Sequence, residues 1–157
     1  MKSLRHIFVA LLATAFCIGC TQEECANHTP KHGFYYLDEQ PIPVESAVIA
    51  EGTHLLVKLS PIADNLHATT YAVVGIHTDL VGTEIDVEYR FHNDDYIFIY
   101  EDPSYYHGAI RPLQRGTIRL NRTTTGLIDL YIDVVLYDGR TFRYENHALE
   151  ATAADVE

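Results

Sequence analysis

The chain has 157 residues, of which 47% are hydrophobic, and its formal net charge is −11 at pH 7. Such an acidic chain repels phosphate groups, so nucleic acid is excluded as an expected partner, and so is attachment to an anionic membrane by charge alone. The length suits one domain with its own hydrophobic core.

The N-terminal residues follow the order of features in a secretion signal. Lys2 and Arg5 precede an apolar run from Ile7 to Ile18. This run is too short for a helix that crosses a hydrocarbon layer of about 30 Å. We therefore expect residues 1–19 to be a signal peptide that is removed.

Two cleavage sites compete at the end of this signal. Residues 13–15 (Ala-Thr-Ala) suit ordinary secretory cleavage, which would release a secreted domain. The motif Cys17-Ile18-Gly19-Cys20 resembles a bacterial lipoprotein box, in which an apolar and a small residue precede the cysteine that receives the lipid. We favour the second site and predict that Cys20 is acylated, because several buried acyl chains anchor a protein durably.

The residues after Cys20 suggest a location. Thr21-Gln22-Glu23-Glu24 resembles the short acidic tag that sends lipoproteins of Bacteroidetes bacteria to the outer cell surface. The resemblance implies a lipid-anchored protein of the bacterial outer membrane that faces outward. A periplasm-facing protein and an ordinary solvated linker stay open as alternatives.

Residues 20–32 have the composition of a flexible tether. Within it, Cys25, His28 and His32 have a spacing that could bring three zinc or copper ligands together. Pro30 interrupts the group and a fourth ligand is missing, so we expect no metal there. With Cys17 removed and Cys20 acylated, Cys25 has no partner for an intramolecular disulfide.

From residue 33 onward the pattern is that of successive strands. We expect roughly eight strands, drawn from segments 34–37, 44–51, 53–60, 69–78, 84–92, 96–100, 117–122, 127–137 and 140–148. Segment 84–92 alternates charged with apolar residues, which indicates one exposed face, whereas segment 96–100 has low polarity on both faces and should be more deeply covered. Asp138-Gly139 predicts a two-residue hairpin turn. Residues 149–157 form an acidic tail that frays or forms a short helix.

This pattern predicts an all-β domain over residues 33–148, in which two antiparallel sheets pack face to face as a β-sandwich. An up-and-down, lipocalin-like barrel with an apolar ligand inside is the alternative. It has the same local pattern, because the sequence of individual strands does not show whether a sheet closes into a barrel.

Four short cues extend the resemblance over most of residues 33–148. They are Phe34-Tyr35-Tyr36-Leu37, Leu80-Val81-Gly82-Thr83, Arg115-Gly116-Thr117-Ile118 and Tyr137-Asp138-Gly139-Arg140-Thr141-Phe142. Their order resembles a wider set of small Bacteroidetes cell-surface lipoproteins. The resemblance implies a place among glycan-handling or adhesive surface components and supplies no catalytic residues.

The carboxylates of residues 84–102 are the candidates for chemistry. Glu84, Asp86 and Glu88 form a regular ladder, which is typical of a solvated strand face, whereas a catalytic acid needs partial burial. The same region offers oxygens for calcium, but no loop has the spacing of an EF-hand. Nucleophile elbows and phosphate-binding glycine motifs are missing from the sequence. We therefore expect no enzyme and no cofactor, and keep a small surface hydrolase or metal-dependent module as the alternative.

Aromatic residues are the remaining candidates for binding. Tyr105, Tyr106 and His107 follow Pro103 in a loop, where exposed rings could stack on sugars or on a partner protein. We predict a non-enzymatic binding or structural module that recognises a glycan or a surface protein.

Overall fold

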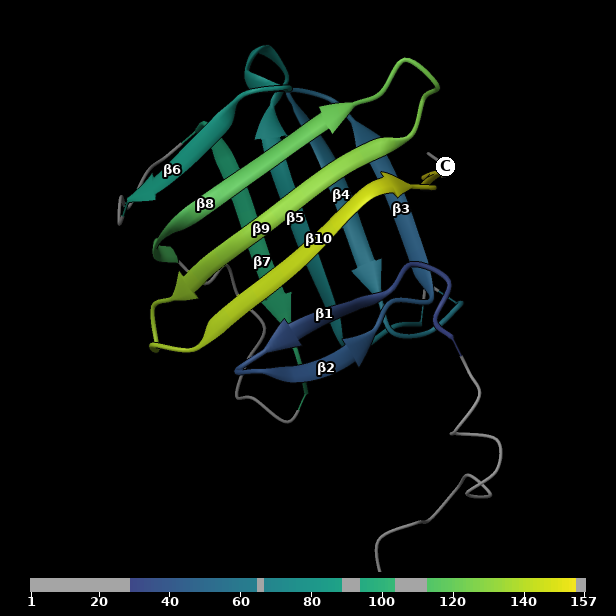
Figure 1. Ribbon diagram of the computed structural model, residues 1–157, viewed down its shortest axis with the longest axis vertical. Coiled ribbons are helices and arrows are strands. Elements are labelled where there is room, and N and C mark those ends of the chain that lie inside the picture. Colours follow the sequence, from purple (N-terminus) through teal and green to yellow (C-terminus); the bar gives the residue numbers. More distant parts are fainter. Residues whose placement is uncertain (1–28, 65–66, 89–93, 104–112, 155–157) are drawn as a thin grey trace, which may run out of the picture.

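The computed structural model describes residues 29–64, 67–88, 94–103 and 113–154. They form two β-sheets that pack face to face with a hydrophobic core between them (Figure 1). The predicted β-sandwich is confirmed. No helix among these residues is long and apolar enough to cross a membrane.

The sheet nearer the viewer in Figure 1, called the front sheet, has six antiparallel strands. In spatial order they are β2 (Gln40–Pro43), β1 (Phe34–Leu37), β10 (Thr141–Leu149), β9 (Ile128–Leu136), β8 (Leu113–Arg122) and β6 (Glu84–Glu88). The strands β8, β9 and β10 follow one another in the sequence and form the centre of this sheet.

The sheet behind it, called the back sheet, has five strands. In spatial order they are β11 (Thr152–Ala153), β3 (Ser46–Glu51), β4 (His54–Ser60), β5 (Tyr71–His77) and β7 (Tyr96–Glu101). Among the described strands only β11 pairs in parallel, with β3, and a short 3₁₀ helix, η1 (Thr78–Leu80), follows β5. Pairing joins no described strand of one sheet to a strand of the other, so the barrel alternative is wrong.

Alternate side chains of both sheets point inward and fill the core. Within it the ring of Phe142 stacks on Tyr35 with centroids 5.0 Å apart and forms a T-shaped pair with Phe98, with centroids 5.2 Å apart. Such aromatic pairs add to the stabilisation from buried area. With no intramolecular disulfide expected, this packing holds the two sheets together.

Strand β2 is a correction to the sequence analysis, which expected no strand between segments 34–37 and 44–51. The turn is confined to Asp38 and Glu39, which both have positive φ (48° and 65°), and pairing resumes at Gln40 opposite Leu37. Pro41 and Pro43 lowered the strand signal because proline cannot donate a backbone hydrogen bond. They are tolerated because β2 is an edge strand.

The C-terminal segment is a second correction. Thr152 and Ala153 neither fray nor form a helix; they add to the edge of the back sheet beside Val48 and Ile49. The backbone N–H of Ala154 donates to the carbonyl of Ile49 at 2.8 Å. A two-residue parallel pairing depends on distant chain segments, so no local pattern could predict it.

The predicted hairpin between β9 and β10 exists, but its turn differs from the prediction. The loop runs from Tyr137 to Arg140, and only Gly139 has positive φ (89°). The N–H of Gly139 donates to the carbonyl of Leu136 at 2.9 Å. The carboxylate of Asp138 accepts a hydrogen bond from Arg140 Nε at 2.9 Å, which holds the loop closed.

Candidate functional site

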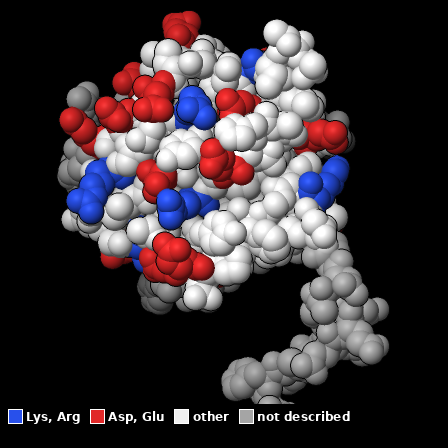
Figure 2. Space-filling model, viewed as in Figure 1, with Lys and Arg blue, Asp and Glu red and all other residues white. Residues whose placement is uncertain are grey.

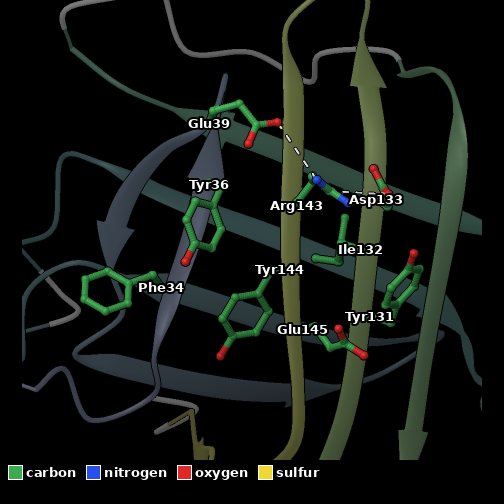
Figure 3. Close-up of a pocket in the computed structure, with 9 residues that line it drawn as sticks. All are labelled: Phe34, Tyr36, Glu39, Tyr131, Ile132, Asp133, Arg143, Tyr144 and Glu145. Atoms are coloured by element: carbon green, nitrogen blue, oxygen red, sulfur yellow. Dashed lines mark ion pairs between the residues drawn. The ribbon is translucent and has the colours of Figure 1, made fainter.

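The outer face of the front sheet carries a shallow depression of about 410 Å³. Strands β1, β10 and β9 supply the side chains around it, together with the turn between β1 and β2 (Figure 3). The lining residues are Phe34, Tyr36, Glu39, Tyr131, Ile132, Asp133, Arg143, Tyr144 and Glu145.

Strand register brings these side chains together. Tyr36 lies opposite Arg143, and Arg143 lies opposite Asp133, so one residue from each of three neighbouring strands forms a row across the sheet. Because side chains alternate between faces, this row points outward while the adjacent Ile132 and Tyr144 point into the core. Both of these side chains are buried, although the two residues are among those that line the depression.

Two aromatic rings lie exposed at one side of the depression. Phe34 and Tyr36 are each 41% exposed, whereas Tyr35 between them is fully buried. Tyr131 lies on the opposite side in Figure 3, and the guanidinium of Arg119 lies 5.5 Å from the centre of its ring. Exposed aromatic rings beside polar groups are typical of a recognition surface.

Arg143 lies between two carboxylates. Its Nη1 is 3.9 Å from Glu39 Oε1 and its Nε is 3.5 Å from Asp133 Oδ2 (Figure 3). These distances are long and the side chains are largely exposed, so the pairs orient the guanidinium but contribute little to stability. The donors and acceptors around Arg143 are therefore accessible to a bound molecule.

A chain of charged side chains continues from the depression across the sheet. Arg119 lies 3.8 Å from Glu84 and 3.9 Å from Asp129, and His147 bridges Asp129 at 2.9 Å and Glu145 at 3.0 Å. The hydrogen bond that the carboxylate of Asp129 accepts from His147 raises the pKa of this exposed histidine above its ordinary value. Figure 2 shows acidic and basic side chains interspersed over this face.

The carboxylates singled out in the sequence lie apart from the depression. Glu84, Asp86 and Glu88 are exposed on the edge strand β6, where their register partners on β8 are Arg119, Thr117 and Arg115. Within the described ranges there is no group of three or more His, Cys, Asp or Glu side chains that could hold a metal ion.

His32 belongs to the folded domain. It is 6% exposed, and its carbonyl oxygen accepts hydrogen bonds from the hydroxyl of Tyr144 at 2.9 Å and from the amide of Asn146 at 3.3 Å. Burial raises the pKa of Tyr144 to about 12, so its hydroxyl remains a donor. Burial also lowers the pKa of His32, which favours the neutral imidazole.

The other predicted site residues lie outside the described residues. These are Cys20, Cys25, His28, Tyr105, Tyr106 and His107. The depression was not predicted, although three consecutive aromatic residues at 34–36 carry a signal for it. A strand cannot bury all three, because neighbouring side chains point to opposite faces.

Comparison with known proteins gives no further guidance, since no family model, no curated protein and no solved structure matches this chain.

Proposed function

We propose that the protein is a non-enzymatic binding module that holds a neutral glycan in the depression of the front sheet. A lipid on Cys20 anchors it to the bacterial outer membrane, with the domain facing outward. The observation that carries the proposal is the pair of exposed rings, Phe34 and Tyr36, beside the outward-facing Arg143 and its two carboxylates.

The chemistry of the depression suits a sugar. One face of a pyranose ring presents C–H groups, which pack on an aromatic ring, and Tyr36 offers such a ring in Figure 3. Sugar hydroxyls both donate and accept, so Asp133 and Glu145 can accept from them while Arg143 donates to them. Hydrogen bonds to charged groups are stronger than those between neutral groups.

The charge of the depression favours neutral glycans. Its three carboxylates, on Glu39, Asp133 and Glu145, face one cation, Arg143. An acidic sugar would meet net repulsion there, and Arg143 already lies between two of the three carboxylates. The alternative of a hydrolase or metal-dependent module has less support, since Glu84, Asp86 and Glu88 are exposed to solvent.

The test is glycan binding by the intact chain, first on an array of neutral and acidic oligosaccharides and then by calorimetry on the best ligand. Tyr36→Ala should weaken binding about tenfold or more, because a stacked ring contributes on the order of 1–2 kcal/mol. Tyr137→Ala is the matched control: Tyr137 is 59% exposed and lies outside the depression.

The proposal fails if no neutral glycan binds, if acidic glycans bind best, or if the two tyrosine variants lose affinity equally. Cleavage of a bound oligosaccharide by the wild type would instead favour the hydrolase.

A further inference from the structure

The outer face of the back sheet is apolar. Alternation along β4 sends Leu55, Val57 and Leu59 into the core and leaves Leu56 and Lys58 facing outward. The same alternation on the neighbouring strands completes a surface called here the back face. Its apolar members are Val48, Ala50, Leu56, Val73, Ile97 and Ile99. All six are partly exposed, and none belongs to the core or packs against it.

Strand register places these side chains in two adjacent rows across four strands. One row runs Val48, Lys58, Val73, Ile99, and the other runs Ala50, Leu56, Gly75, Ile97. The apolar groups are therefore contiguous. Contiguous apolar patches on a soluble domain mark interaction surfaces, whereas single exposed apolar residues do not.

Gly75 makes the back face flat. A Cβ at this position would collide with the terminal methyl group of Leu56, so the glycine leaves room for the leucine side chain to lie across the neighbouring strand. The other members are short or β-branched, and they give the surface little relief. A flat, β-branched sheet face is the surface on which a second sheet packs, at a spacing of about 10 Å.

Charge indicates which molecule provides that second sheet. Lys58 is the one charged side chain in the two rows; its Nζ lies 4.5 Å from the centre of the Tyr71 ring, whose hydroxyl donates to Glu101. The back face thus balances one cation against one nearby carboxylate on a chain of net charge −11. Two copies of an acidic chain repel each other least through a face without net charge.

The sequence itself predicts that this face is covered. Residues 96–100 have low polarity on both sides, as in a strand buried on both faces. In the single chain, however, β7 is the last strand of its sheet, and its outward Ile97 and Ile99 are partly exposed. A second molecule against the back face accounts for that pattern.

We propose that two copies of the chain pack back face against back face around a two-fold axis. Such a contact is self-complementary, as in most homodimers. It buries the apolar rows and leaves both front sheets exposed on opposite sides. The proposal is independent of any glycan.

The experiment measures the mass of the full chain in solution. Cys20→Ser removes the predicted lipid attachment, a reducing agent excludes disulfides, and light scattering after size exclusion is compared with the subunit mass from mass spectrometry. We expect twice the subunit mass. Val73→Glu should weaken dimerisation at least about a hundredfold, because it places a carboxylate in the apolar contact.

Val135→Glu is the matched control. Val135 is also partly exposed on a central strand, but it faces outward from the front sheet beside Arg115, so this variant should remain a dimer. Val73→Thr is a milder second variant that keeps the shape and strand preference of valine, in case Val73→Glu does not fold as judged by circular dichroism. It should weaken dimerisation by roughly tenfold.

Four results would overturn the proposal. They are a monomeric parent protein at micromolar concentration, a dimer that survives both Val73 variants, an equal loss in Val135→Glu, and a monomer whose back face takes another occupant. The last would appear as adsorption to phosphatidylcholine vesicles, or as a stoichiometric co-purifying protein, that Val73→Glu abolishes.

Discussion

Gly116 lies where β8 passes so close to β9 that no side chain fits. Its φ is +132°, and a Cβ there would lie 2.6 Å from the Cα of Val134 and nearer still to the carbonyl oxygen of Asp133. Both neighbours are backbone atoms that cannot rotate away. In Gly116→Ala the strained φ costs about 1–2 kcal/mol and the forced backbone shift about 1–3 kcal/mol. We therefore expect the free energy of unfolding to fall by roughly 2–5 kcal/mol.

Gly126→Ala separates the two parts of this cost. Gly126 also has positive φ (83°), but beyond its chain neighbours no atom of the described residues lies within 4 Å of the position that a Cβ would take. Only the conformational cost of about 1–2 kcal/mol therefore applies. Urea unfolding followed by circular dichroism measures both variants. If Gly116→Ala loses no more stability than Gly126→Ala, the inferred close approach of the two strands is wrong. A shift at Asp133 should also weaken the proposed binding of a glycan, because Asp133 lies beside Arg143.

Three further predictions concern the core, a buried histidine and the anchor. Phe142→Ala should lower the free energy of unfolding by about 3–5 kcal/mol in urea titrations, and a loss no larger than that of the exposed Phe34→Ala would contradict the aromatic centre of the core. Burial lowers the pKa of His32 in the folded state, so protonation of this histidine favours unfolding. Its contribution to the free energy of unfolding is fully present above about pH 6.5, the pKa of an unfolded histidine, and is lost as the pH falls through the lower folded-state pKa. On acidification the free energy of unfolding should therefore fall further in the wild type than in His32→Gln. Equal decreases in the two proteins would refute this prediction. Cys20→Ala should remove an acyl-sized increment from the intact mass and release the protein from cells, whereas an unmodified wild-type Cys20 with cleavage near Ala15 would show a secreted domain.

The fold was largely predictable because its main strands carry their own pattern. Alternation of apolar and polar residues is visible locally in Glu84–Glu88 and Ile128–Leu136, and it decides which face is buried. The missed strands, β2 and β11, lie at sheet edges. Their pairing depends on where the rest of the sheet ends, and no short window of sequence contains that information.

The candidate site was less predictable than the fold for the same physical reason. Local alternation implies that Tyr36 or its neighbours must face outward, but the row Tyr36, Arg143, Asp133 exists only because of the register between three strands. Residues 36 and 143 are distant in sequence, and a register shift of one residue would place Arg143 on the core side. The candidate site therefore depends on how the strands pair. The site proposed from the sequence, Tyr105, Tyr106 and His107, was instead chosen from the composition of a loop.

The two outer faces of the sandwich differ in polarity. The front face carries interspersed charges around the depression, so it is stable in water and open to a polar ligand. The back face carries two rows of mostly apolar side chains, which a monomer would leave partly in contact with water. If the back faces pair, each dimer presents two identical depressions pointing away from each other. Because the two depressions point in opposite directions, one dimer would contact two separate chains of a long or repetitive glycan. The dimer would then cross-link glycan chains and would not bind a single chain more tightly.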